Sequence, residues 1–220
     1  MSGLIEKVKD FSRQVGKFTF VKYTMVHPFK GYWELRRGYN GSLQGGILIL
    51  LVWLVTQLMR NQLAGFIFNP RYGQPPNFLL DSLTVLIPFF LWCISNWCLT
   101  TLMDGEGRMR DIVAATAYSV CPLIFGNVLV IILSNVLTVK ESMYISVIDA
   151  LFMVWAVLLI VIGTLTIHNY TLLKTIITCI FTIVVMAAII FLLLLLFTLS
   201  QEIMGFIGSI IKEISYRNVG

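Results

Sequence analysis

The sequence predicts an all-α membrane protein with five transmembrane helices and an amphipathic interfacial helix at each end. Five intervals contain no charged residue and are 22, 22, 28, 24 and 27 residues long. They are residues 38–59, 82–103, 112–139, 150–173 and 175–201. A helix needs about 20 apolar residues to cross roughly 30 Å of hydrocarbon. Because lipid offers the backbone no hydrogen-bond partners, runs this apolar span a membrane as helices.

Composition agrees with this fold class, since 58% of the residues are hydrophobic and only 12% are charged. Five spans occupy most of the 220 residues and leave no room for a separate soluble catalytic domain. We therefore divide the chain into a basic amphipathic cytoplasmic segment (1–37), a five-span membrane domain (38–201) and an amphipathic external tail (202–220).

The distribution of positive charge predicts the orientation. Eight of the sixteen Lys and Arg residues precede the first span, and that side of the membrane receives eleven against five on the other. The excess places the N-terminus in the cytoplasm and the C-terminus outside. The first thirty residues contain no continuous apolar stretch, so we expect an uncleaved first span.

Both ends of the chain show helical amphipathic periodicity. Residues 4–18 place apolar side chains on one face and basic ones on the others, which is typical of a helix lying on a membrane surface or docked on the spans. Residues 203–214 repeat the pattern, and indicate an interfacial helix or a docking surface for a partner.

Two spans contain a proline, Pro88 in the second and Pro122 in the third. Each removes a backbone hydrogen bond, so we expect a kink or local unwinding at both. Discontinuous helices form binding sites in transporters, but prolines are also ordinary structural features of membrane helices.

Asp149 has two interpretations. At the outer N-terminus of the fourth span the helix dipole favours it, whereas at mid-bilayer it indicates proton or cation handling. Asn96, Asn127 and Asn135 are buried polar candidates of the kind that joins helices. His168 is expected at the cytoplasmic end of the fourth span, where an imidazole needs no special role.

Motifs for catalysis, phosphate binding or metal binding do not occur in the sequence, and we expect no catalytic residue, cofactor or metal and no nucleic-acid partner. The acidic and basic residues of 104–111 can pair with one another, and Gly105 and Gly107 suit a tight turn between spans two and three. We interpret this segment as structural and the protein as no enzyme.

The segment 104–111 resembles the Gly-Gly-x-Gly-type turn of the Yip family, named for Ypt-interacting proteins, Ypt being a Rab GTPase. Ala117-Tyr118-Ser119-Val120-Cys121-Pro122 is similar to that family's Gly-Tyr-Ser-x-x-Pro element. The likeness covers about residues 25–200 and implies the five-span layout, with the N-terminus inside. A short basic N-terminus without the Asp-Leu-Tyr-Gly-Pro element favours a prokaryotic-like member in a bacterial plasma membrane, without Rab binding.

The resulting hypothesis is a non-enzymatic integral membrane protein that binds or organises another membrane component, such as an accessory subunit of a transport complex. Its expected partners are the lipid bilayer and a membrane protein, for instance a transporter, and an oligomer is compatible with this role. The alternative is a small channel or permease for an ion or small solute, built around Pro88, Pro122 and Asp149.

Overall fold

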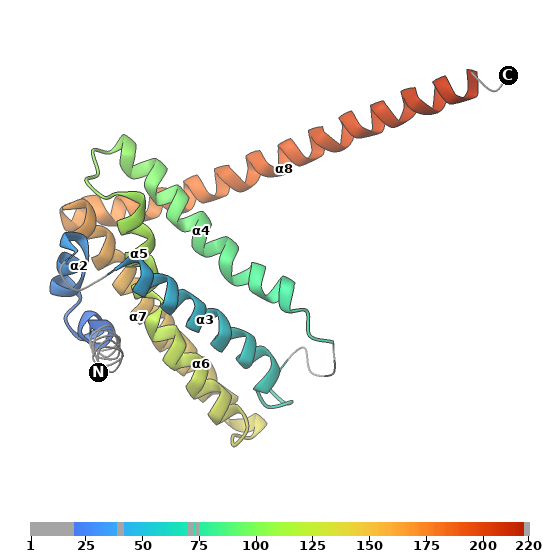
Figure 1. The fold of residues 1–220 in the computed structure, drawn as a ribbon. Helices are drawn as coiled ribbons and strands as arrows, with labels where there is room; N and C mark the ends of the chain where they lie inside the picture. The colour runs from blue at the N-terminus through green and yellow to red at the C-terminus, as the bar shows by residue number, and fades with distance from the viewer. Residues whose placement is uncertain (1–19, 39–41, 70–72, 74, 218–220) are drawn as a thin grey trace, which may run out of the picture.

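The computed structural model describes residues 20–38, 42–69, 73 and 75–217, and the regular structure of these residues is entirely helical (Figure 1). The elements are α2 (Pro28–Arg37), α3 (Leu43–Leu63), α4 (Phe78–Leu102), α5 (Met109–Ser119), α6 (Cys121–Ser134), the short 3₁₀ helix η1 (Val139–Glu141), α7 (Ser142–His168) and α8 (Leu172–Arg217). Five segments of the described chain are long and apolar enough to cross a membrane: α3, α4, α5 with α6, η1 with α7, and α8. The predicted fold class is confirmed. The amphipathic helix predicted for residues 4–18 lies outside the described residues.

The helices pack so that the connections gather at two ends of the bundle. At one end, α2 contacts α5 and α7, and lies near the 103–108 connection and the turn between α7 and α8. We call this the basic end, because Arg36, Arg37 and Lys174 lie there. At the opposite end, the α3–α4 connection meets the end of α6 through a bond from the Gly65 N–H to Ser134 Oγ (3.0 Å). Because successive spans cross the membrane in opposite directions, five spans place alternate connections at opposite ends of the bundle, as observed.

Local sequence explains where several helices begin and end. Pro28 is in the first turn of α2, where its missing N–H costs nothing, and Gly38 ends α2 with a φ of 71°. Ser42 caps α3 by accepting a hydrogen bond from the Gly45 N–H (3.1 Å), and Asn77 caps α4 in the same way. The helical chain is interrupted at His27, because a proline disfavours helical backbone at the residue that precedes it.

The two prolines have different effects. The third span is interrupted at Val120 (φ −82°, ψ −2°), where α5 ends and α6 begins with Pro122 in its first turn. Local unwinding predicted at Pro122 is confirmed. In contrast, α4 continues through Pro88 from Phe78 to Leu102, so the predicted unwinding does not occur there.

The core lies where α3 crosses α5. A Cβ placed on Gly46 would lie 3.2 Å from Ala114 Cα, so the two backbones are nearly in contact. Beside this crossing, Tyr118 is 2% exposed and packs edge-on against Phe20, with ring centroids 5.6 Å apart. Small residues thus bring two spans together around a buried aromatic pair.

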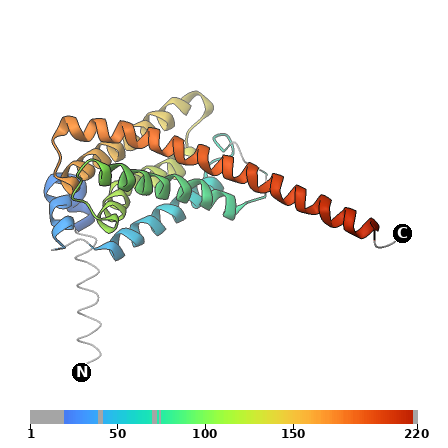
Figure 2. The ribbon, with the colours of Figure 1, turned by 90° about the horizontal axis from the view of Figure 1, so that it is seen from above.

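Helix α8 is one unbroken helix of 46 residues, whereas the sequence analysis divided it into a span (175–201) and a separate tail (202–220). Near its start, Thr175, Thr178 and Thr182 are fully buried, and α8 packs along α4. Further along, Phe191 and Leu194 are 64% and 61% exposed. Figures 1 and 2 show that this second half projects away from the bundle.

Candidate functional site

The structure places the predicted site residues in three regions. Pro88 and Asp149 line a polar cleft towards the opposite end of the bundle. Asn96 lines a small buried cavity, and Gly105 and Gly107 belong to the connection that covers it. Tyr118 and Pro122 flank the helix break, and Tyr118 belongs to the core.

The polar cleft has a volume of about 530 Å³ and lies between α3, α4, α6 and α7. It is lined by Trp53, Gln57, Arg60, Thr84, Val85, Pro88, Leu123, Asn127, Asp149, Ala150 and Met153. Within it, the Arg60 guanidinium donates two hydrogen bonds to Asp149, to Oδ1 at 2.8 Å and to Oδ2 at 2.6 Å. This two-point geometry is the strongest arrangement for such a pair.

Asp149 does not have the helix-end position that the sequence analysis favoured. Helix α7 begins at Ser142, so Asp149 lies seven residues inside it, about 10 Å along the axis. At that distance the partial charge of the helix end contributes little. The partner that stabilises this carboxylate is Arg60, which the charge-free interval had left outside the first span but which lies within α3.

Asparagine side chains extend the cleft network from helix to helix. Asn127 on α6 accepts a bond from Arg60 (3.2 Å) and donates to Gln57 Oε1 (3.0 Å), both on α3. Asn135 donates to the Leu63 carbonyl (2.9 Å), again joining α6 to α3. Both asparagines thus join helices as predicted, but Asn127 is buried whereas Asn135, which was also expected to be buried, is exposed.

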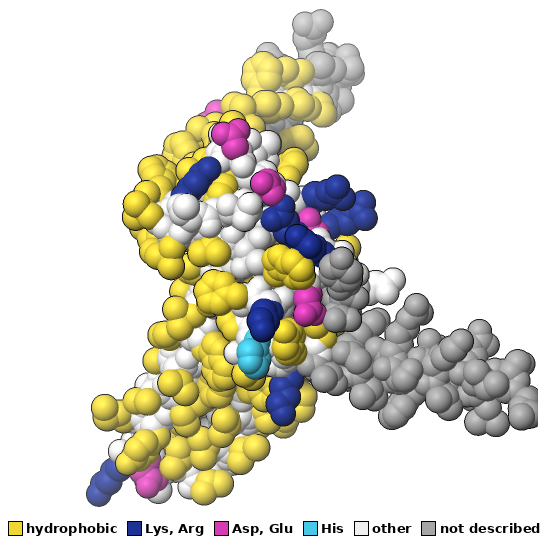
Figure 3. Space-filling view, turned by 90° about the vertical axis from the view of Figure 1, so that its left-hand side faces the viewer, with side chains coloured by type: hydrophobic (Ala, Val, Ile, Leu, Met, Phe, Trp, Pro, Cys, Tyr) yellow, Lys and Arg dark blue, Asp and Glu magenta, His cyan; other side chains and the backbone are white. Residues whose placement is uncertain are grey.

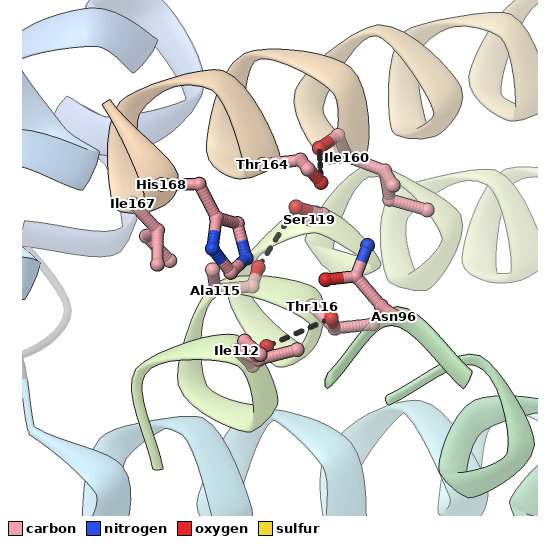
Figure 4. A pocket seen from close by; sticks show the side chains of 9 residues that line it. All are labelled: Asn96, Ile112, Ala115, Thr116, Ser119, Ile160, Thr164, Ile167 and His168. Carbon is pink, nitrogen blue, oxygen red and sulfur yellow. Dashed lines mark hydrogen bonds between the residues drawn. The ribbon is translucent and has the colours of Figure 1, made fainter. Parts of the chain in front are cut away.

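The buried cavity lies nearer the basic end and has a volume of about 10 Å³, enough for the centre of about one water molecule (Figure 4). Asn96 and His168 point into it from α4 and α7. Neither the Asn96 side-chain amide nor His168 Nε2 forms a hydrogen bond within the described part of the chain. Asn96 therefore joins no helices there, unlike the other two asparagines, and its polar atoms face a space the size of a water.

His168 has a specific position rather than the unremarkable interfacial one expected. It is 2% exposed, and its Nδ1 accepts a hydrogen bond from the Gly107 N–H (3.3 Å). In a neutral imidazole this leaves the proton on Nε2, the nitrogen that faces the cavity. A Cβ on Gly105 would lie 2.6 Å from His168 Nδ1, and one on Gly107 would lie 2.6 Å from Cε1 of the same ring. Glycine is needed because the connection passes directly over the imidazole.

Further contacts fix this connection at the basic end. The Met103 carbonyl accepts bonds from the Tyr170 hydroxyl (2.9 Å) and from Lys174 Nζ (2.8 Å). Arg36 of α2 forms an ion pair with Glu106, and its hydrogen bond holds the pKa of that carboxyl below the ordinary value of 4.5. Figure 3 looks onto this end, where acidic and basic side chains gather between hydrophobic areas.

Comparison with known proteins identifies the family. A family model described as the Yip1 domain matches residues 22–209, which is most of the chain. The protein belongs to the Yip1 family. Neither the curated proteins nor the solved structures yielded a match.

The two sequence elements that resembled the Yip family have distinct physical roles in this Yip1 domain. The glycine-containing turn packs on His168, as described above. In the second element, Tyr118 packs in the core, Ser119 shares a 2.6 Å hydrogen bond with Tyr32 of α2, and Pro122 follows the break. Burial raises the pKa of Tyr32, so this hydroxyl stays neutral.

Sequence reasoning missed the residues that complete both sites. The sequence shows no motif that pairs Arg60 with Asp149 or that assigns Gln57 or His168 to a site. The one available signal was the presence of Arg60 directly after a charge-free interval, at a place where a helix can continue.

Proposed function

We propose that this Yip1-family protein is a non-enzymatic integral membrane protein that binds or organises another membrane component through the projecting half of α8. The observation that supports this most directly is the exposure of that half. Its large apolar side chains from Phe191 to Ile211 are between 40% and 70% exposed. The long apolar surface is therefore not used by the described bundle itself.

The length of α8 strengthens this argument. The apolar part, Leu172–Ile211, has 40 residues and is about 60 Å long at 1.5 Å per residue. A hydrocarbon core is only about 30 Å thick, so a straight helix of this length exceeds what one crossing requires. The remaining apolar surface needs cover, and a membrane-protein partner, such as a component of a transport complex, supplies it.

A photo-crosslinking amino acid at Leu194 tests this role, with Leu151 as the control because it is 61% exposed on α7, within the bundle. We expect Leu194 to crosslink to one discrete membrane protein in intact cells, and Leu151 to crosslink mainly to lipid. Mild-detergent purification followed by identification of the crosslinked chain then names the partner. Crosslinks to lipid alone at both positions would contradict the proposal.

A second candidate function is a small channel or permease. The cleft and the cavity lie at two levels of the bundle, because Pro88, which lines the cleft, and Asn96, which lines the cavity, are about 12 Å apart along the axis of α4. This arrangement favours a channel or permease. Between them lies a buried apolar cluster of Leu50, Phe89, Cys93, Ile112 and Ala117. For the scaffold role we expect no solute or proton flux above empty vesicles after reconstitution. A pH-dependent flux that disappears in folded Asp149→Asn protein would favour the permease instead.

A further inference from the structure

The ion pair in the polar cleft retains binding capacity. Arg60 has five N–H groups, and three hydrogen bonds from it reach acceptors among the described residues. Each Asp149 oxygen accepts one of these bonds and has a second lone pair. The two side chains are 27% and 37% exposed, so an incoming ligand can reach both charges.

Apart from Gln57, Thr84 and Asn127, the other residues that line the cleft are apolar. Trp53, Pro88 and Met153 are among these apolar residues. Helices α3 and α4 line two sides of the cleft through Trp53 and Gln57 and through Thr84 and Pro88. On α4, Leu83 and Ile87 are 40% and 56% exposed beside the cleft. The cleft thus suits a ligand with a head that carries both charges and an apolar body that lies against the exposed side chains of α4.

The depth of the charges identifies the source of such a ligand. Arg60 lies three residues before the end of α3, about 5 Å along the axis, and Asp149 lies about 10 Å from the start of α7. Both are therefore near one end of the spans, at the level where lipid headgroups meet hydrocarbon. A volume of about 530 Å³ accommodates a headgroup and the first part of its chains.

We propose that the cleft binds a phospholipid whose headgroup carries a phosphate and a primary ammonium, as in phosphatidylethanolamine. The phosphate accepts hydrogen bonds from the free edge of Arg60, and the ammonium donates to Asp149. A choline headgroup has no N–H to donate, and a glycerol headgroup brings no second cation to Asp149 beside Arg60. This lipid site goes beyond the proposed role of α8 and does not depend on it.

Native mass spectrometry of the full-length protein in mild detergent tests the site. The probes are short-chain phosphatidylethanolamine, phosphatidylcholine and phosphatidylglycerol, each added to delipidated protein. We expect the protein to retain one phosphatidylethanolamine molecule at an added lipid concentration about tenfold lower than it needs for either of the other two lipids. One charge-assisted contact typically supplies a difference in affinity of this size. Asp149→Asn and Arg60→Gln should lose this preference. Arg36→Gln, which breaks the matched ion pair at the basic end, should keep it.

A second variant leaves the charges unchanged. Ala150→Phe fills the cleft beside Asp149 and should abolish lipid retention even if the charge variants fail to fold. Equal retention of the three lipids by the wild type, or an unchanged preference in Ala150→Phe, would overturn the proposal. In a final experiment, free phosphoethanolamine is added as a competitor of the bound lipid. If it displaces the lipid at equal concentration, the site takes a soluble zwitterion, and the lipid assignment is wrong.

Discussion

Arg60 and Asp149 lie 89 residues apart in the chain and form two parallel hydrogen bonds between α3 and α7, of 2.8 and 2.6 Å. Each side chain is partly withdrawn from solvent. Inside an otherwise apolar bundle, either charge alone would lack compensation. The pair is consequently a structural link between two spans as well as the polar centre of the cleft.

Asp149→Asn is expected to lower the free energy of unfolding by about 1–3 kcal/mol, because it leaves the Arg60 charge without its ionic partner. The double variant Arg60→Gln/Asp149→Asn should cost less than the sum of the single changes. Thermal unfolding in one detergent measures all three. Glu202→Gln, at an exposed acid on α8, is the control and should change little. An unchanged Asp149→Asn stability would restore the helix-end interpretation.

Gly107→Ala should destabilise the basic end by about 1–3 kcal/mol, the usual cost of overpacking. Its new Cβ would lie 2.6 Å from both His168 Cε1 and Ile167 Cγ2, and neither a buried ring nor a helix side chain moves away easily. Gly205→Ala is the matched control, since nothing lies within 4 Å of its Cβ position. There, the gain in helix propensity should be neutral or stabilising. Equal melting temperatures for the two variants would refute the close packing of the turn.

The sequence predicted the spans well because hydrophobic length is a property of each segment by itself. It failed at the ion pair for a related reason. Ending each span at the first charge placed Arg60 outside α3, although the helix continues to Leu63 and pairs that charge internally. Asp149 was then assigned to a helix end, because its partner on α3 could be recognised only from the packing of α3 and α7 on α6.

Single polar residues were the least predictable part of the site. Gly105 and Gly107 were recognised as turn residues, but the ring they cover, His168, comes from a segment more than 60 positions away. Conversely, the break at Pro122 was predictable, because proline acts on its own backbone. Local chemistry could be predicted from sequence, whereas contacts between distant spans required the structure.

The ion pair between Arg36 and Glu106 should make stability depend on pH. Its hydrogen bond lowers the pKa of Glu106 in the folded state, so the contribution is complete above the unfolded value near 4.5 and is lost as pH falls through the folded pKa. The melting-temperature difference between wild type and Glu106→Gln should follow this course, and Arg36→Gln should show the same loss. A difference that persists at the acid end of the titration would exclude the ion pair as its source.

Pro122→Ala is expected to lower the free energy of unfolding by about 1–2 kcal/mol, because Pro122 is fully buried and the variant loses ring methylenes from a packed site. Tyr118→Phe should be milder, since it keeps the buried ring and loses only a hydroxyl, at about 0.5–1.5 kcal/mol. Chemical unfolding of both variants, with partner binding measured in parallel, provides the comparison. Unchanged stability and binding in Pro122→Ala would argue against a structural role for the break.

The orientation of the bundle is the last prediction. The ratio of eleven to five Lys and Arg residues favours the basic end in the cytoplasm. Arg110 and Lys140 are both exposed and lie at the basic end and the opposite end, respectively. Each is changed to cysteine in a background without Cys93, Cys98, Cys121 and Cys179. A membrane-impermeant thiol reagent added to intact cells should label the Lys140→Cys protein, and should label the Arg110→Cys protein only after the cells are opened. The reverse pattern would invert the topology and place the polar cleft towards the cytoplasmic leaflet.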